Sequence, residues 1–223
     1  MNPTMKWEKV DQYLTEKLIP HDPMLEQVLD ANKLNELPTY DVSPVQGKLL
    51  NLLIQIQGAT RILEIGTLGG YSTIWMGRAL PQGGKIVTLE IDPLHAEVAQ
   101  ANINLANLPC AVEIRVGNAL DQLAQMKQEE VEPFDFIFID ADKPNNPHYL
   151  KWALEFSHPG TLIIGDNVIR DGEVINAESE DPRVQGVRQF YDLLAEEKRI
   201  TATAIQTVGQ KGYDGFVLGV VTH

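Results

Sequence analysis

Short apolar segments alternate with amphipathic stretches along most of the chain, and this alternation limits the fold more than any other feature. The stretches between the apolar segments repeat their hydrophobic residues every three or four positions, which is the period of a helix. Strands that alternate with helices form a parallel sheet with helices on both faces. We therefore predict a doubly wound, Rossmann-like α/β fold. The predicted strands are 61–65, 85–90, 112–116, 134–140 and 161–165, and the predicted helices are 73–80, 93–108, 119–128, 148–157 and 184–199.

The two ends of the chain extend this alternating region. Two helices are predicted before it, over 24–34 and 44–57, and the second has Ser43 as its N-cap and Pro44 as its first residue. After it, two β-rich runs flank a short glycine-containing loop and predict a hairpin over 201–221. The sheet should then have about seven strands. We expect one domain over residues 1–223, with N-terminal helices over 1–57 and the Rossmann-like core over 58–223.

The composition is that of a soluble globular protein. Hydrophobic residues make up 43% and charged residues 22% of the 223 residues. No apolar run is long enough to cross a membrane, and the N-terminus lacks the apolar stretch of a signal peptide. The single cysteine, Cys110, fits a reducing compartment, so we expect a cytoplasmic protein. The net charge of -13 argues against a nucleic-acid partner, because that affinity depends on clustered Lys and Arg.

The first predicted strand runs into a glycine-rich turn, EIGTLGGYS, over residues 64–72. In doubly wound folds the ligand lies at the carboxyl ends of the strands, beside this turn. A dinucleotide motif reads G-x-G-x-x-G, but Leu68 stands where its second glycine should be, so a pyrophosphate would meet a side chain. Glu90 ends the second strand, where a carboxylate accepts both ribose hydroxyls. Together with the acidic Glu64, this pattern favours a nucleoside ligand without phosphates, such as S-adenosylmethionine. Ser72 has two possible roles, as the N-cap of the next helix or through a hydroxyl that reaches the ligand.

A second polar group follows the fourth and fifth predicted strands. Asp140 ends one strand, and Asp166-Asn167 ends the other. Neighbouring strands lie about 4.8 Å apart, so the two carboxylates should repel each other unless a cation lies between them. With the Asn167 carbonyl they offer three hard oxygen ligands, which suit Mg²⁺, Mn²⁺ or Ca²⁺. Taken singly, each aspartate has an alternative role as the cap of a helix or turn.

Lys143 follows Asp140 by three residues. A lysine at this position is ordinarily a surface residue. Beside a bound cation, however, its pKa should fall, which would make it a usable general base. Asp142 either orients this lysine or only occupies the loop.

These motifs resemble those of the cation-dependent O-methyltransferases, the family of the caffeoyl-coenzyme A and catechol O-methyltransferases. The resemblance covers residues 42–221, and the interval from Asp140 to the Asp-Asn pair is its most specific part. It is carried by LEIGTLGGYST (63–73), TLEIDP (88–93), GNAL (117–120), FIFIDADK (136–143) and GTLIIGDNV (160–168).

The resemblance implies a set of site residues, a reaction and an assembly. Its cofactor site would hold S-adenosylmethionine through Val42, Glu64, Gly66, Thr67, Ser72, Glu90, Ala119 and Asp140. Its metal ligands would be Asp140, Asp166 and Asn167, with Mg²⁺ the expected ion. Lys143 matches the base that deprotonates a catechol-type hydroxyl. Members of this family are usually homodimers.

Two other functions fit parts of the pattern. A nicotinamide-dependent dehydrogenase shares the fold, but Leu68 and the Asp166-Asn167 pair count against it. A non-catalytic S-adenosylmethionine-binding protein would not need the whole second polar group. The chain departs from the family at Pro144 and Pro147, and residues 1–41 match loosely. These regions border the expected acceptor pocket, so the identity of the acceptor stays open.

Overall fold

A computed structural model describes residues 3–223; residues 1 and 2 of the predicted N-terminal region lie outside the described part. Within that part, seven strands form one sheet in the order β3-β2-β1-β4-β5-β7-β6. The parallel strands are β1 (Arg61–Ile65), β2 (Lys85–Glu90), β3 (Ala111–Val116), β4 (Phe136–Ile139) and β5 (Leu162–Asp166). Strand β7 (Gly212–Val221) is antiparallel to β5 and to β6 (Ile200–Gly209). The predicted Rossmann-like sheet with a closing hairpin is confirmed.

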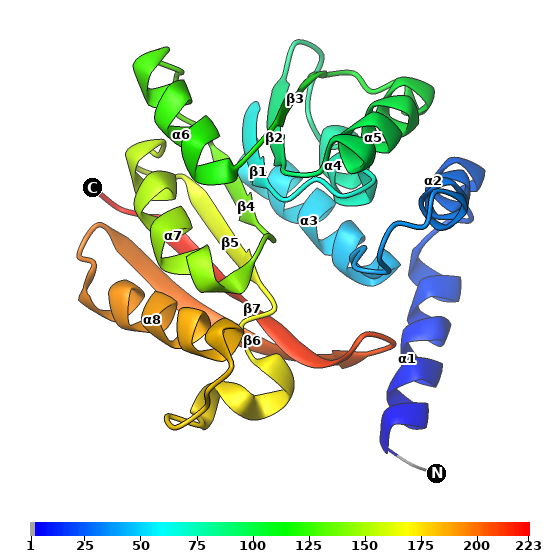
Figure 1. Cartoon of the computed structure of the whole chain (residues 1–223). Helices are drawn as coiled ribbons and strands as arrows, with labels where there is room; N and C mark the ends of the chain where they lie inside the picture. The colour runs from blue at the N-terminus through cyan, green and yellow to red at the C-terminus, as the bar shows by residue number, and fades with distance from the viewer. Residues whose placement is uncertain (1–2) are drawn as a thin grey trace.

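Helices cover both faces of the sheet (Figure 1). One face carries α3 (Pro44–Gln57), α4 (Tyr71–Gly77) and α5 (Pro93–Ala106), and the other carries α6 (Ala119–Gln128), α7 (Asn146–Glu155) and α8 (Pro182–Glu196). Successive residues of a strand point into different cores. Ile62 packs with Phe138 under α3 and α4, whereas Leu63 packs with Ile137 under α6 to α8. Burial on both faces explains why β1 and β4 are almost continuously apolar.

The N-terminal region holds one helix more than we predicted. Helix α1 (Pro3–Leu18) precedes α2 (Pro23–Leu34) and α3. No residue of α1 is buried, although Trp7, Val10, Leu14 and Leu18 recur at helical spacing; our prediction did not use this pattern. It lies beside the β6–β7 hairpin (Figure 1), where the carboxylate of Asp11 accepts a hydrogen bond of 2.9 Å from the Gln210 N–H.

Helix ends follow most of the expected caps. The Ser43 hydroxyl accepts from the Gln46 N–H at 3.2 Å, and Gly58 ends α3 with φ +72°. The capping role expected of Ser72 is wrong: Gly70 is the N-cap of α4, and Ser72 lies inside the helix. Two 3₁₀ turns, η1 (Lys143–Asn145) and η2 (Arg170–Ile175), follow β4 and β5. None of the helices in residues 3–223 has the length and apolarity that crossing a membrane requires.

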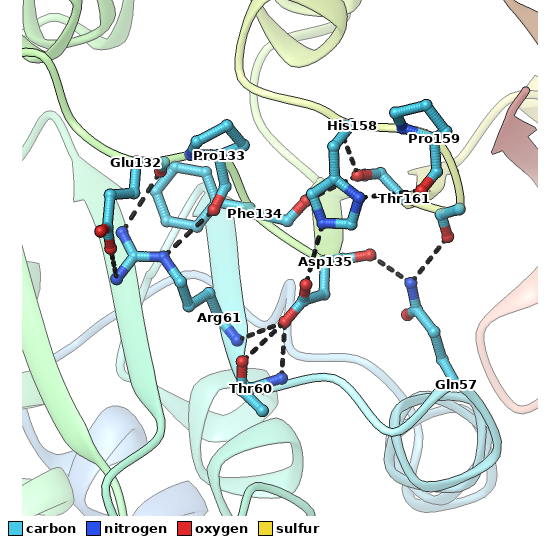
Figure 2. Close-up of polar contacts among 11 residues, drawn as sticks. Gln57, Thr60, Arg61, Glu132, Pro133, Phe134, Asp135, His158, Pro159 and Thr161 are labelled. Carbon is cyan, nitrogen blue, oxygen red and sulfur yellow. Dashed lines mark hydrogen bonds and ion pairs between the residues drawn. The ribbon is translucent and has the colours of Figure 1, made fainter. Parts of the chain in front are cut away.

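The amino ends of the central strands are joined by a polar cluster around Asp135 (Figure 2). One oxygen of Asp135 accepts from the backbone N–H groups of Thr60 and Arg61, at 2.7 and 2.9 Å. The other oxygen lies 2.9 Å from Nε2 of His158. Because these residues lie at or just before the first residues of β1, β4 and β5, the cluster fixes the edge of the sheet opposite the carboxyl ends of the strands.

Candidate active site

The carboxyl ends of β1, β2, β4 and β5 bring most of the predicted site residues together. In the parallel register, Ile139 of β4 lies opposite Gly165 of β5, so Asp140 and Asp166 follow as neighbours. Strand β1 lies between β2 and β4, which places the glycine-rich turn between Glu90 and Asp140. The two polar groups read from the sequence therefore share one edge of the sheet.

Glu64 is a fully buried carboxyl group at this edge. It accepts hydrogen bonds from the hydroxyls of Ser72 and Thr73, and from that of Thr88 at 2.7 Å. Burial nevertheless raises the pKa of Glu64 to about 7, since desolvation outweighs these three donors. Ser72 therefore serves as a partner of Glu64. Such a carboxyl group ionises readily when a cationic ligand arrives.

The glycine-rich turn is held by Glu90. Its carboxylate accepts from the backbone N–H of Leu68 at 2.8 Å and of Thr67 at 3.3 Å, and from that of Asp92 at 2.9 Å. The turn needs positive φ at Gly66 (+106°), Leu68 (+51°) and Gly70 (+82°). Leu68 thus tolerates a conformation that glycine favours.

Two further predicted cofactor residues lie outside this turn. Val42 is buried just before α3, in the core shared by α3, α4 and α5. Ala119 is the first residue of α6, and the turn before it is fixed to the sheet because the Gly117 N–H donates to the Glu90 carbonyl at 2.8 Å. Ala119 therefore begins at the same edge as Glu90.

Lys143 and Asp140 form a close ion pair, with Nζ 2.8 Å from Oδ1. Lys143 is buried, since only 6% of the residue is exposed. The pair is backed by α8, because a Cβ added to Gly186 would lie 2.2 Å from the Lys143 carbonyl oxygen. Asp142 takes another part: it accepts from Asn145 at 2.6 Å and from the Tyr149 hydroxyl, and so holds the start of α7.

Asp166 is the buried partner of this pair. Its Oδ1 accepts from the Asn167 N–H at 2.8 Å, and its Oδ2 accepts from the side-chain amide of Gln46 at 2.6 Å. Burial, followed by repulsion from Asp140, raises the pKa of Asp166 to about 7. Asn167 has φ +55°, so the chain bends sharply directly after Asp166. Gln46 belongs to no motif, and our sequence analysis did not select it.

The donor set at this point fits a hard cation. In residues 3–223 no group of three His, Cys, Asp or Glu side chains that could hold a metal ion is found. The ligands predicted from the sequence, Asp140, Asp166 and Asn167, are two carboxylates and one amide. Oxygen donors of this kind suit Mg²⁺, Mn²⁺ or Ca²⁺ rather than zinc. Burial first, and then repulsion from Asp140, raise the pKa of Asp166, and a bound cation would oppose both effects.

A sequence model described as O-methyltransferase matches residues 16–218. The chain belongs to this O-methyltransferase family. It is 51% identical to a catechol O-methyltransferase of Niastella koreensis over 217 residues, which cover 96% of this chain and 97% of the relative. The family resemblance seen in the motifs is therefore confirmed.

Solved structures agree with this assignment. An O-methyltransferase from Bacillus cereus in complex with SAH is 61% identical, with a TM-score of 0.97 over 98% of this chain and 100% of that one. TomG from Streptomyces achromogenes, an O-methyltransferase of tomaymycin synthesis in complex with SAM, is 45% identical, with a TM-score of 0.96 over 100% of both chains. The protein is an S-adenosylmethionine-dependent O-methyltransferase, and the dehydrogenase and the non-catalytic binder are set aside.

Proposed function

We propose that this O-methyltransferase methylates one hydroxyl of a catechol-type acceptor and requires a divalent cation, preferably Mg²⁺. One observation carries the proposal: the Lys143–Asp140 ion pair and the buried Asp166 lie together at the edge of the sheet that also carries Glu90. Two adjacent hydroxyls are the natural partner of a cation with open coordination positions. The name of the relative from Niastella koreensis supports the same acceptor class.

The cofactor would lie along the glycine-rich turn. Glu90 is oriented by three backbone N–H groups, which leaves lone pairs of its carboxylate for the ribose hydroxyls. Glu64 lies behind the turn and would balance the positive charge of S-adenosylmethionine. The full proposed set is Val42, Glu64, Gly66, Thr67, Ser72, Glu90, Ala119 and Asp140.

The cation would be held by Asp140, Asp166 and Asn167. When bound, such an ion lowers the pKa of a neighbouring hydroxyl and orients the acceptor. Asp140 has a second task here, because the same carboxylate also holds the Lys143 ammonium at 2.8 Å.

Lys143 would act as the general base. In its neutral form the Nζ nitrogen takes the proton of the reacting hydroxyl, while the hydroxyl oxygen forms a bond to the methyl carbon. The bond from that carbon to sulfur breaks in line, and S-adenosylhomocysteine leaves. The short contact with Asp140 and the close packing of α8 keep Nζ in place, so the protein's main contribution is to hold oxygen and methyl near attack distance.

We further propose that two copies of the chain pair through the outer face of α3 and the hairpin. Leu52 and Ile56 on α3 are exposed, as are Ile205 on β6 and Val220 on β7. Ile205 pairs with Phe216, which belongs to the core under α3, so Ile205 faces the same side of the sheet. Light scattering on the purified protein should give the mass of a dimer.

A cytoplasmic location stays an expectation from the single cysteine.

The first experiment is methyl transfer from labelled S-adenosylmethionine to a panel of small catechols, with Mg²⁺ and then with EDTA. We expect transfer that EDTA abolishes. The matched variants are Asp166→Asn, which should lose transfer, and Asp171→Asn, which changes an exposed aspartate of η2 and should keep it. Methyl transfer that persists in EDTA and in the Asp166→Asn variant would overturn the proposed requirement for a cation. Transfer to a phenol with a single hydroxyl, and not to catechols, would overturn the acceptor class.

A further inference from the structure

We infer that Gln46 is a positioning residue that holds the Asp166 carboxylate ready for the cation. The side-chain amide of Gln46 donates to Asp166 Oδ2 at 2.6 Å, across 120 positions of the sequence. Among the described residues, this is the one side-chain hydrogen bond that Asp166 accepts. The inference rests on the proposed cation-dependent function and adds a residue outside the ligand set.

The backbone of Gln46 is fixed independently of Asp166. Its N–H donates to the Ser43 hydroxyl, and the Gly47 N–H donates to the Ser43 carbonyl at 2.8 Å, so both belong to the capped first turn of α3. That turn is pressed against α4, because a Cβ on Gly47 would lie 2.4 Å from the ring of Trp75. One turn further on, Asn51 donates to the Trp75 carbonyl at 3.0 Å. The side-chain amide of Gln46 therefore extends from a backbone that is held rigidly.

A neutral donor is suited to this position. The Asn167 N–H fixes one oxygen of Asp166, and the Gln46 amide fixes the other, which sets the plane of the carboxylate. A lysine or arginine in the same place would neutralise the charge that attracts the cation. Glutamine orients the carboxylate and leaves its charge in place. Partners of metal ligands in this position change metal affinity by about 10- to 100-fold when they are removed.

The test measures Mn²⁺ affinity, by electron paramagnetic resonance of the free ion, in the wild type and in variants of two glutamines on α3. Gln46→Met keeps the length of the side chain and loses the amide, and we expect its Mn²⁺ dissociation constant to rise about tenfold or more. Gln46→Lys keeps a donor and adds a positive charge, and should bind Mn²⁺ at least as weakly. The matched control is Gln55→Met, because Gln55 is exposed and, among residues 3–223, its amide donates to Asn51 alone. In all of these variants, the affinity for S-adenosylhomocysteine and the melting temperature should stay at wild-type values.

The outcomes separate this inference from the proposed function. Equal Mn²⁺ affinity in the wild type and in Gln46→Met overturns the role of Gln46 and leaves the cation in place. Parallel losses of Mn²⁺ and S-adenosylhomocysteine affinity also overturn it, since they indicate general damage to the fold. A wild-type protein that binds no Mn²⁺ overturns the proposed cation itself, and with it this inference.

Discussion

Gly66 and Asp140 lie so close that no side chain fits between them: a Cβ on Gly66 would be 2.2 Å from the Asp140 carbonyl oxygen. The contact continues the pairing of β1 with β4, because the Asp140 N–H donates to the Ile65 carbonyl at 2.9 Å. The turn that would carry the cofactor and the loop that carries the ion pair are thus in backbone contact. A shift in one displaces the other.

Gly66→Ala should therefore abolish S-adenosylhomocysteine binding and lower the melting temperature. The new Cβ meets backbone atoms, which have little freedom to retreat, at a position with φ +106°. The matched control is Gly58→Ala, where φ is +72° but nothing lies within 4 Å of the added Cβ. That control should lose only about 1–2 kcal/mol of stability and keep its affinity. Calorimetry measures the affinity for S-adenosylhomocysteine, and thermal melts measure the stability. Normal binding by Gly66→Ala would show that the turn adapts to the added methyl group.

Lys143→Met should lower kcat by about 10²- to 10⁴-fold, the usual contribution of a general base. Affinity for S-adenosylhomocysteine should be retained, because Lys143 contacts Asp140 and not the glycine-rich turn. Lys151→Met, which changes an exposed lysine on α7, is the control and should be fully active. Single-turnover methyl transfer measures the effect. A Lys143→Met enzyme with wild-type kcat would mean that another group, or water, takes the proton.

Much of the fold and the pairing of Asp140 with Asp166 followed from sequence because both depend on local signals. Short apolar runs and helical patterns mark the elements, and the order of parallel strands then brings consecutive strand ends together. Asp140 and Asp166 each come at the end of a strand, so the prediction that they are neighbours needed only that β4 pairs with β5.

The features that escaped prediction depend on contacts far apart in the chain. Gln46 reaches Asp166 only because α3 begins above the carboxyl end of β5, and nothing in the first turn of that helix indicates this. Serine is a residue type that often caps helices, yet the hydroxyl of Ser72 donates to the buried Glu64. Helix α1 is the exception, since Trp7, Val10, Leu14 and Leu18 recur at helical spacing and our prediction did not use this local pattern.

Glu90→Gln should raise the dissociation constant for S-adenosylmethionine about tenfold, because the amide has one acceptor oxygen in place of two and would lose a hydrogen bond from a ribose hydroxyl to a charged group, worth about 1.5–3 kcal/mol. The carboxylate accepts from three backbone N–H groups, on both of its oxygens. An amide must turn its NH₂ toward at least one of these donors. Glu97→Gln, an exposed change on α5, is the control and should bind normally. Isothermal titration of both variants is the measurement, and equal affinities would show that Glu90 is not needed in its charged form.

The His158–Asp135 pair should make the stability of the enzyme depend on pH above neutrality. Nδ1 of His158 lies 2.9 Å from the Pro159 carbonyl and Nε2 lies 2.9 Å from Asp135, so both ring nitrogens face acceptors (Figure 2). The Pro159 carbonyl and the Asp135 carboxylate accordingly raise the pKa of His158 above its usual 6.5. A raised folded-state pKa gives stability that is complete below 6.5 and is lost as the pH rises through the folded value. Because the imidazole is partly exposed, the effect should be at most about 1 kcal/mol.

Urea unfolding of the wild type and of His158→Gln tests this at pH 6 and pH 9. The free-energy difference between the two proteins should be larger at pH 6, where the imidazolium is present. Burial also raises the pKa values of Glu64 and Asp166, which makes both proteins less stable as the pH rises toward 7, and this common trend cancels in the comparison. His148→Gln, at an exposed position on α7, is the control and should follow the wild type at both pH values. The free-energy difference between the wild type and His158→Gln could instead be the same at pH 6 and pH 9. The imidazole would then stabilise the fold by packing and neutral hydrogen bonding, because a contribution from the imidazolium charge must disappear on deprotonation.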